Sequence, residues 1–347
     1  MKRITSFVIL VSLIVFSSCR ATEIKPIVDP LPPVSSNTFY KGADVGWLTE
    51  MEAAGKKFYN SAGQEMECMA LLKSLGMNSL RLRVWVNPAA GWNNAADVVK
   101  KAVRAKALGM AVMIDFHYSD DWADPGKQNK PAAWASLDIN GLKTAVASHT
   151  TDVLTQIKNA GVTPLWVQVG NELDNGFLWP DGKASVSMPN FTSLINAGYD
   201  AVKTVFPSTK VIVHVSNGWN NSLFRWIFDG LKSNGGKWDV IGMSLYPSYT
   251  SVGWATANEQ CLQNMNDMVS RYNSEVMVVE VGMPWDMAAD CKLFIKDLIT
   301  KVKSLPNNKG QGVLYWEPQS YNGWKGYTLG AFDNAGKPTV ALDAFAN

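Results

Sequence analysis

Eight short apolar runs recur along the chain, separated by longer stretches of mixed character. Each run is almost continuously apolar, which is typical of strands that are buried on both faces of a parallel sheet. Parallel strands need a long connection between them, usually a helix, so these runs constrain the fold more than any other feature. The runs cover Gly42–Val45, Ser79–Val86, Ala111–His117, Leu165–Gly170, Val211–Val215, Val240–Leu245, Val276–Val281 and Gly312–Trp316.

The stretches between the runs have apolar residues at helical spacing. They predict helices over Glu65–Leu75, Asp97–Leu108, Leu142–Ala160, Phe191–Phe206 and Ala289–Val302. Several of them end at a glycine, as at Gly76, Gly109 and Gly161, where a helix favours a residue that tolerates the left-handed conformation. Eight strand-then-helix units without a break in composition predict an α/β fold, a single-domain (β/α)8 TIM barrel. A doubly wound open sheet is the rival, but no glycine-rich phosphate loop follows any run.

In such a barrel, the residues that perform chemistry lie where a strand ends and its loop begins. The ends of these runs carry carboxylates, imidazoles, amides and indoles, which predicts a polar cleft with aromatic walls. These residues are Asp44, Arg81, Arg83, Asp115, His117, Asn171, Glu172, His214, Asn217, Ser244, Tyr246, Glu280, Trp316 and Glu317.

Two glutamates stand out, because each closes a buried run and faces the expected mouth. Glu172 ends the fourth run and Glu280 the seventh, so their carboxylates can approach one ligand from opposite sides of the barrel. Glycoside hydrolysis requires such a pair, with one acid protonating the leaving oxygen while the other attacks or activates water. A structural salt bridge is the alternative for either glutamate alone.

Four further sequence blocks narrow this interpretation. Residues 81–88 read RLRVWVNP, residues 115–120 DFHYSD, residues 122–125 WADP and residues 315–318 YWEP. Together with Gly170–Glu172 and Glu280, they resemble the endo-β-1,4-galactanases of glycoside hydrolase family 53, within the clan of retaining (β/α)8 glycosidases. The resemblance runs from about Tyr40 to Phe345.

The resemblance implies roles for the residues nearest the reaction. Glu172 would be the general acid/base and Glu280 the nucleophile, while Asn171 would bind the 2-hydroxyl of the sugar in subsite −1. Tyr246 would hold Glu280 by its phenol, and Arg83 would add positive charge that keeps the nucleophile ionised. Glu172 should have a raised pKa, because it lies beside a second carboxylate and apolar walls.

The remaining predicted binding residues surround this centre. His117 and His214 would bind the −1 sugar, and Trp316 would form its platform. The loop from Asp124 to Lys127 would extend the cleft, and Asp44 at the end of the first run is grouped with these residues.

No cofactor is expected. Asp115, His117 and Asp124 could be imagined as metal ligands, but the later acids belong to a different loop. Some bacterial members of the family hold calcium in long insertions after strands seven and eight. Here residues 282–286 run quickly into a helix and the loop after Pro318 is expected to be brief, so we do not expect calcium.

The N-terminus carries a predicted export signal. Lys2 and Arg3 precede an apolar stretch over Phe7–Phe16, which is too short to span a bilayer. Ser17-Ser18-Cys19 follow and resemble the lipobox of bacterial lipoproteins, although phenylalanine stands where that motif usually has leucine. An ordinary cleaved signal peptide is the alternative.

This pattern divides the chain into three parts. We expect a lipoprotein signal peptide over residues 1–18 with Cys19 lipidated, a flexible tether over residues 19–39 and a catalytic (β/α)8 domain over residues 40–347. The protein is then exported and held at the outer membrane by its lipid anchor, at the cell surface or in the periplasm.

Several residues outside the expected site are assigned to packing. Cys68 has the spacing of a buried helix face, whereas Cys261 and Cys291 could form a disulfide in an exported protein. His149 is expected on a surface or interface, and Trp226 in the core.

Composition agrees with a carbohydrate ligand. The net charge of +2 gives no basic footprint for nucleic acid, and 14 Trp, 10 Tyr and 13 Phe supply more aromatic faces than the core needs. The resemblance predicts endo-acting hydrolysis of β-1,4-galactan in pectin by a monomer, with retention of configuration. The alternatives are a lipid-tethered glycan-binding protein without catalysis, or a related endo-β-glycanase acting on mannan, xylan or β-glucan.

Overall fold

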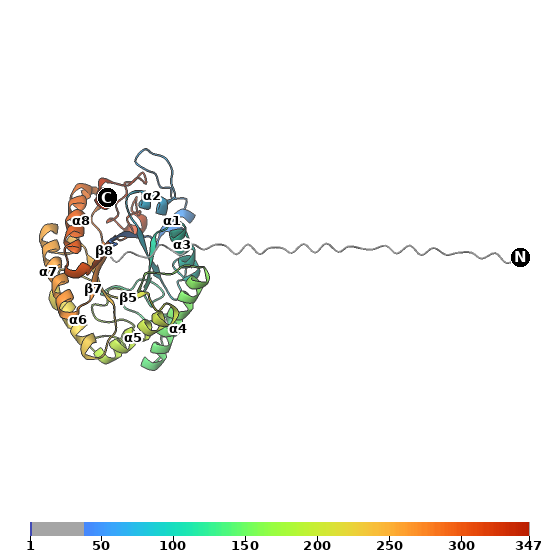
Figure 1. Cartoon of the computed structure of the whole chain (residues 1–347), viewed down its shortest axis with the longest axis vertical. Helices are drawn as coiled ribbons and strands as arrows, with labels where there is room; N and C mark the ends of the chain where they lie inside the picture. Colours follow the sequence, from blue (N-terminus) through green and yellow to red (C-terminus); the bar gives the residue numbers. More distant parts are fainter. Residues whose placement is uncertain (2–37, 347) are drawn as a thin grey trace. The chain divides into compact units, whose positions relative to one another are not determined.

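The computed structural model describes Met1 and residues 38–346. Residues 36–347 form a compact unit of their own. Eight parallel strands close into a barrel in chain order, and the helices form a ring around them (Figure 1). The strands are β1 (Tyr40–Asp44), β2 (Ser79–Val84), β3 (Ala111–Phe116), β4 (Trp166–Val169), β5 (Lys210–Val215), β6 (Val240–Leu245), β7 (Glu275–Val281) and β8 (Gly310–Tyr315). The predicted (β/α)8 fold is confirmed, and the strand ends differ from prediction by at most two residues.

The outer ring contains eight α-helices and six short 3-10 helices in the described residues. The α-helices are α1 (Leu48–Ala53), α2 (Cys68–Ser74), α3 (Ala95–Ala107), α4 (Ile139–Asn159), α5 (Met188–Val205), α6 (Asn221–Ser233), α7 (Trp254–Tyr272) and α8 (Ala288–Lys303). The 3-10 helices are η1 (Ala132–Trp134), η2 (Pro247–Tyr249), η3 (Trp285–Met287), η4 (Pro306–Asn308), η5 (Trp324–Gly326) and η6 (Val340–Phe345). None of the helices in the described residues combines the length and apolar character that crossing a bilayer requires.

Glycines end the helices as predicted. Gly76, Gly109 and Gly161 have φ angles of +97°, +67° and +74°, a region that other residues enter only at a cost. At Gly76 a side chain is also excluded by space, because an added Cβ would lie 2.2 Å from the carbonyl oxygen of Phe345. The turn before β2 therefore packs directly against η6, near the end of the chain.

The barrel interior is apolar in one layer and polar in the next. Met113, Trp166 and Ile212 belong to a buried apolar cluster. Two positions further along the same strands lie Asp115, Gln168 and His214, each fully buried. Because residues i and i+2 of a strand point to the same side, this polar layer sits directly on the apolar one and towards the C-terminal mouth.

The possible disulfide between Cys261 and Cys291 is not formed. Both thiols are free and buried, one in α7 and the other in α8. The sulfur of Cys291 lies 3.7 Å from the hydroxyl of Tyr315. Cys68 is buried in the core, as predicted. Each of these three cysteines is therefore a small apolar packing residue.

The expectation of a brief loop after Pro318 is wrong. The chain continues from Trp316 to Thr339 with only η5 and an isolated bridge between Phe332 and Pro338. The segment after β7 is short, as predicted, since η3 leads directly into α8. The long segment after β8 contributes Tyr327 and Lys325 to the mouth of the barrel.

The predicted signal peptide, Cys19 and the tether lie outside the described residues, apart from Met1, Thr38 and Phe39. Trp226 was placed in the wrong environment, because it is 43% exposed on α6. His149 is half-buried, and its ring packs against Phe116 and Trp134 with ring centroids 5.6 and 6.1 Å away. Its Nε2 atom is buried and has no hydrogen-bond partner among the described residues.

His149 is expected to weaken the fold in acid. Burial lowers the pKa of His149 to about 4, whereas an unfolded histidine has a pKa of about 6.5. Above pH 6.5 both states are neutral, so the stability is lost as the pH falls from about 6.5 to 4. Urea unfolding at pH 7 and 4.5 should show that His149→Phe removes about 2 to 3 kcal/mol of this loss. Parallel pH profiles for the two proteins would contradict this assignment.

Candidate active site

Both predicted glutamates face one cavity of about 410 Å³ at the C-terminal ends of the strands. Glu172 follows β4 and Glu280 lies near the end of β7. The other lining residues are His117, Trp122, Ala123, Asp124, Pro125, Asn171, Ser216, Asn217, Ser244, Tyr246, Tyr249, Trp316 and Tyr327. The cavity therefore combines two carboxylates with indole and phenol rings, as the sequence predicts.

Residues at the C-terminal end of β6 form hydrogen bonds with both carboxylates. Ser244 donates a hydrogen bond of 2.7 Å to Oε1 of Glu172, and Tyr246 donates one of 3.0 Å to Oε2 of Glu280. Ser244 and Tyr246 are two residues apart and point to the same side of the strand. Ser244 also stands opposite Glu280 in the β6–β7 ladder, just after a register shift. These contacts bring the two carboxylates to the same strand end, and they confirm the predicted contact between Tyr246 and Glu280.

The backbone of Glu172 adopts an unusual conformation. Its φ angle is +46°, in the left-handed region that residues with a side chain rarely enter. The amide of Glu172 donates to Nδ1 of His214 at 3.3 Å, and the next amide, of Leu173, donates to the carbonyl of His214 at 2.8 Å. Strained residues of this kind persist where their surroundings fix them, often at functional sites.

The pKa values of the two glutamates are both raised, but not equally. Burial and the nearby Glu280 carboxylate raise the pKa of Glu172 well above its ordinary value, as expected. Burial also raises the pKa of Glu280, although Arg81 and the Tyr246 hydroxyl act in the opposite direction. The two pKa shifts therefore have the same direction. Since only Glu280 contacts a guanidinium, the charged form is favoured more at Glu280 than at Glu172.

Arg81, not Arg83, provides the positive charge beside Glu280. Nη1 of Arg81 lies 2.8 Å from Oε1 of Glu280, and the same guanidinium pairs with Asp44 and Asp115. Its Nη2 also donates to Oδ1 of Asn171 at 2.8 Å. The predicted role of Arg83 is wrong, because Arg83 forms a buried ion pair with Glu317 instead.

Four tryptophans enclose the guanidinium of Arg83. Its Cζ atom lies 4.5 Å from the ring centroid of Trp122 and 5.8 Å from that of Trp316. Trp47 and Trp85 lie at 5.3 and 5.4 Å. We call these four residues the indole cage. Nε and Nη2 of Arg83 have no hydrogen-bond acceptor among the described residues, so the ring faces are their main electrostatic partners.

Most predicted binding residues lie in the cavity, but four do not. His117, Asp124, Asn171, Tyr246 and Trp316 line it. Asp44 and Arg83 are fully buried in ion pairs beside it. His214 is fully buried and donates from Nε2 to Ser244 at 2.8 Å, so it supports Glu172 through the serine. Lys127 pairs with Asp121 at 2.6 Å and does not line the cavity.

Burial shifts the pKa values of His214 and Asp44 in opposite directions. Burial and Arg81 lower the pKa of His214 well below its usual value. Burial raises the pKa of Asp44 to about 8, and its Oδ1 atom has no partner among the described residues. Asp115 remains ionised because Arg81 and His117 lower its pKa despite burial. Arg81 therefore faces three carboxyl groups, of Asp44, Asp115 and Glu280, and among them only Asp115 has a lowered pKa.

Sequence reasoning missed the supporting roles of Arg81, Ser244 and Gln168. Gln168 accepts from Nε of Arg81 at 3.2 Å and donates to Oδ1 of Asp115 at 2.6 Å. Arg81 and Ser244 stand two positions before Arg83 and Tyr246 and so face the same interior. This two-residue spacing was the available signal, but it does not indicate which residue lies deeper.

No metal centre is indicated in residues 38–346. The described residues contain no group of three or more His, Cys, Asp and Glu residues placed to hold an ion. Asp115, the best-placed candidate, is instead paired with Arg81 and with Nε2 of His117 at 2.9 Å.

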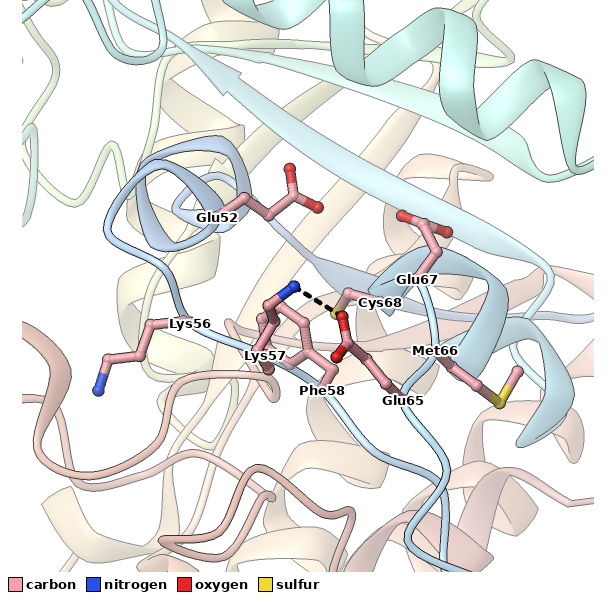
Figure 2. A pocket seen from close by; sticks show the side chains of 8 residues that line it. All are labelled: Glu52, Lys56, Lys57, Phe58, Glu65, Met66, Glu67 and Cys68. Atoms are coloured by element: carbon pink, nitrogen blue, oxygen red, sulfur yellow. Dashed lines mark hydrogen bonds and ion pairs between the residues drawn. The ribbon is translucent and has the colours of Figure 1, made fainter.

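A separate cavity of about 410 Å³ lies beside α1 and the start of α2 (Figure 2). Four of the five charged residues in its lining form ion pairs, and the fifth, Lys56, lies over the ring of Tyr321. Lys57 pairs with Glu65 at 2.7 Å, and Arg104 binds Glu52 at 2.6 Å as well as Glu67. Figure 2 shows the Lys57–Glu65 ion pair among the lining side chains. With most of its charges paired and neither Glu172 nor Glu280 in its lining, this cavity is not the reaction site.

Known proteins are similar to this chain in sequence. Residues 40–293 and 288–345 match the model of glycosyl hydrolase family 53. An arabinogalactan endo-β-1,4-galactanase of Thermothelomyces thermophilus is 34% identical over 302 residues, which cover 80% of this chain and 89% of that protein. A probable arabinogalactan endo-β-1,4-galactanase A of Neosartorya fischeri is 35% identical and covers 82% of this chain and 85% of its own length.

Two solved structures are similar to this chain in fold and sequence. One from a study of two fungal β-1,4-galactanases has a TM-score of 0.82 and 34% identity, covering 88% of this chain and 98% of that chain. The GH53 catalytic domain of Ignisphaera aggregans has a TM-score of 0.81 and 30% identity, covering 92% and 98%.

Proposed function

Because this chain belongs to glycosyl hydrolase family 53, we propose that it cleaves internal β-1,4-galactosidic bonds of galactan and of arabinogalactan side chains in pectin. The observation that carries the proposal is the pair Glu172 and Glu280 in one cavity, with a cation on only one of them. A retaining glycosidase needs this asymmetry, because one carboxyl group must give a proton while the other attacks.

Glu280 is the proposed nucleophile. Arg81 and Tyr246 hold its two oxygens at 2.8 and 3.0 Å, which fixes the carboxylate and favours its ionised form. It attacks the anomeric carbon, the bond to the leaving oxygen breaks, and a glycosyl-enzyme ester forms.

Glu172 is the proposed general acid and then the general base. Its raised pKa keeps the proton available for the leaving oxygen. After the proton has been transferred, the carboxylate accepts a proton from water, and the resulting hydroxide releases the sugar from Glu280. Asn171, which lines the cavity and is held by Arg81, is proposed to bind the 2-hydroxyl, and Trp316 to stack on the sugar.

Substrate choice is tested by measuring reducing-end release from galactan, mannan, xylan and β-glucan. We expect activity on galactan, a first-formed product with the β configuration by proton NMR, and no loss after dialysis against EDTA. Activity on another glycan alone would reject the substrate, and an α product would reject retention. Galactan that is bound but never shortened would favour a non-catalytic binding protein.

The roles of the two acids are tested with an aryl galactoside that has a good leaving group. Glu172→Ala should still form the glycosyl-enzyme, since such a leaving group needs no proton, and azide should speed its release with retained configuration. Glu280→Ala cannot form this ester, so it should lose most turnover. The assignment would be contradicted if azide rescued neither variant, or if it rescued Glu172→Ala with an inverted product.

We also propose that the protein is exported, lipidated at Cys19 and active as a monomer. The support is the order of Lys2 and Arg3, the apolar stretch and Ser17-Ser18-Cys19, together with a site built from one chain. Growth with a labelled fatty acid should label the wild type but not Cys19→Ser, and light scattering of the released domain should give the monomer mass. Equal labelling of the wild type and Cys19→Ser would reject lipidation at Cys19.

A further inference from the structure

A second cavity opens beside the catalytic one, at the same mouth of the barrel. It has a volume of about 500 Å³ and is formed by the segments after β1, β2 and β3, with Lys325 of η5. Four tryptophans line it: Trp47, Trp85, Trp92 and Trp122. We call it the tryptophan groove.

The groove and the catalytic cavity share a wall. Trp122 lines both of them, and its ring centroid lies 5.8 Å from that of Trp316 in the catalytic cavity. Trp47 contacts both rings, at 5.7 and 5.0 Å. A ligand that leaves the catalytic cavity past Trp122 therefore meets a further aromatic surface.

The chemistry of the groove favours a neutral ligand. Lys325 is paired with Glu50 at 2.7 Å. The Asp120 carboxylate already accepts the amides of Asn87 at 3.0 Å and Ala132 at 2.8 Å. Asp121, the remaining charged residue of the lining, pairs with Lys127 at 2.6 Å. With these charges satisfied inside the protein, the groove offers indole surface rather than an ionic site. The indole N–H of Trp85 also lacks an acceptor among the described residues.

We propose that the tryptophan groove binds galactosyl units of the same galactan chain, beyond the units held in the catalytic cavity. This inference rests on the proposed function, because an endo-acting enzyme must hold a polymer that extends past the bond it cleaves. The apolar face of a pyranose suits an indole ring, and its hydroxyls suit the polar groups at the rim. The groove thus makes the enzyme more effective on long chains than on short substrates.

Trp92 is the residue with which to test the groove. It is half-buried in the lining and stands outside the indole cage around Arg83, so its truncation leaves that cage intact. Trp226 is a matched control, because it is 43% exposed on the outer helix α6 and lines neither the groove nor the catalytic cavity. Trp92→Phe keeps a smaller aromatic ring at the same place.

We expect Trp92→Ala to lower kcat/KM on galactan about tenfold, equivalent to about 1.4 kcal/mol, through a higher KM. An aryl β-galactobioside is too short to fill both cavities, so its hydrolysis does not use the contact with Trp92. Its kcat/KM should therefore change less than about twofold, against about tenfold for galactan. Trp92→Phe should recover part of the loss, and Trp226→Ala should match the wild type on both substrates.

Two results would overturn the proposal. One is equal loss on the polymer and the short substrate, which would indicate damage to the fold or the catalytic cavity. The other is unchanged activity of Trp92→Ala on galactan. Both differ from a failure of the proposed function, in which the wild type itself would not shorten galactan.

Discussion

The guanidinium of Arg81 organises the floor of the catalytic cavity. It is fully buried and binds Asp115, Glu280, Asn171 and Gln168, so one side chain fixes groups from β3, β4 and β7. A buried cation is costly unless its charge is paired and its N–H groups have acceptors. Here carboxylates and side-chain amides provide both. The same arrangement orients the proposed nucleophile. Stability and chemistry therefore depend on the same set of contacts.

The fold could be predicted because each strand repeats one simple pattern. Runs such as Val240–Leu245 are apolar except for one serine, and the glycines at positions 76, 109 and 161 mark the helix ends. The position of a residue at the end of a run also predicted which residues face the mouth. What it could not predict was the long segment after β8, because a loop held by scattered contacts, such as Tyr327 to the carbonyl of Trp316 at 3.2 Å, has no period.

The site was predicted where a residue's position at a strand end was sufficient. Glu172, Glu280 and Tyr246 follow from this rule alone. Arg83 and His214 were misassigned because depth in the barrel depends on strand stagger and on neighbours from distant strands, which one sequence does not reveal. Both residues face the interior as expected, yet each is covered, one by the indole cage and the other by Ser244.

The indole cage explains how a cleft can be apolar at its surface and charged beneath. The Arg83–Glu317 pair lies under Trp122 and Trp316, and the ring faces stabilise a guanidinium that has few hydrogen-bond acceptors. In return, the fixed cation restricts where these rings can lie. Since Trp122 belongs to both cavities, the position of Arg83 sets the wall between the site of bond cleavage and the tryptophan groove. A buried charge thereby shapes the surface that meets a neutral polymer.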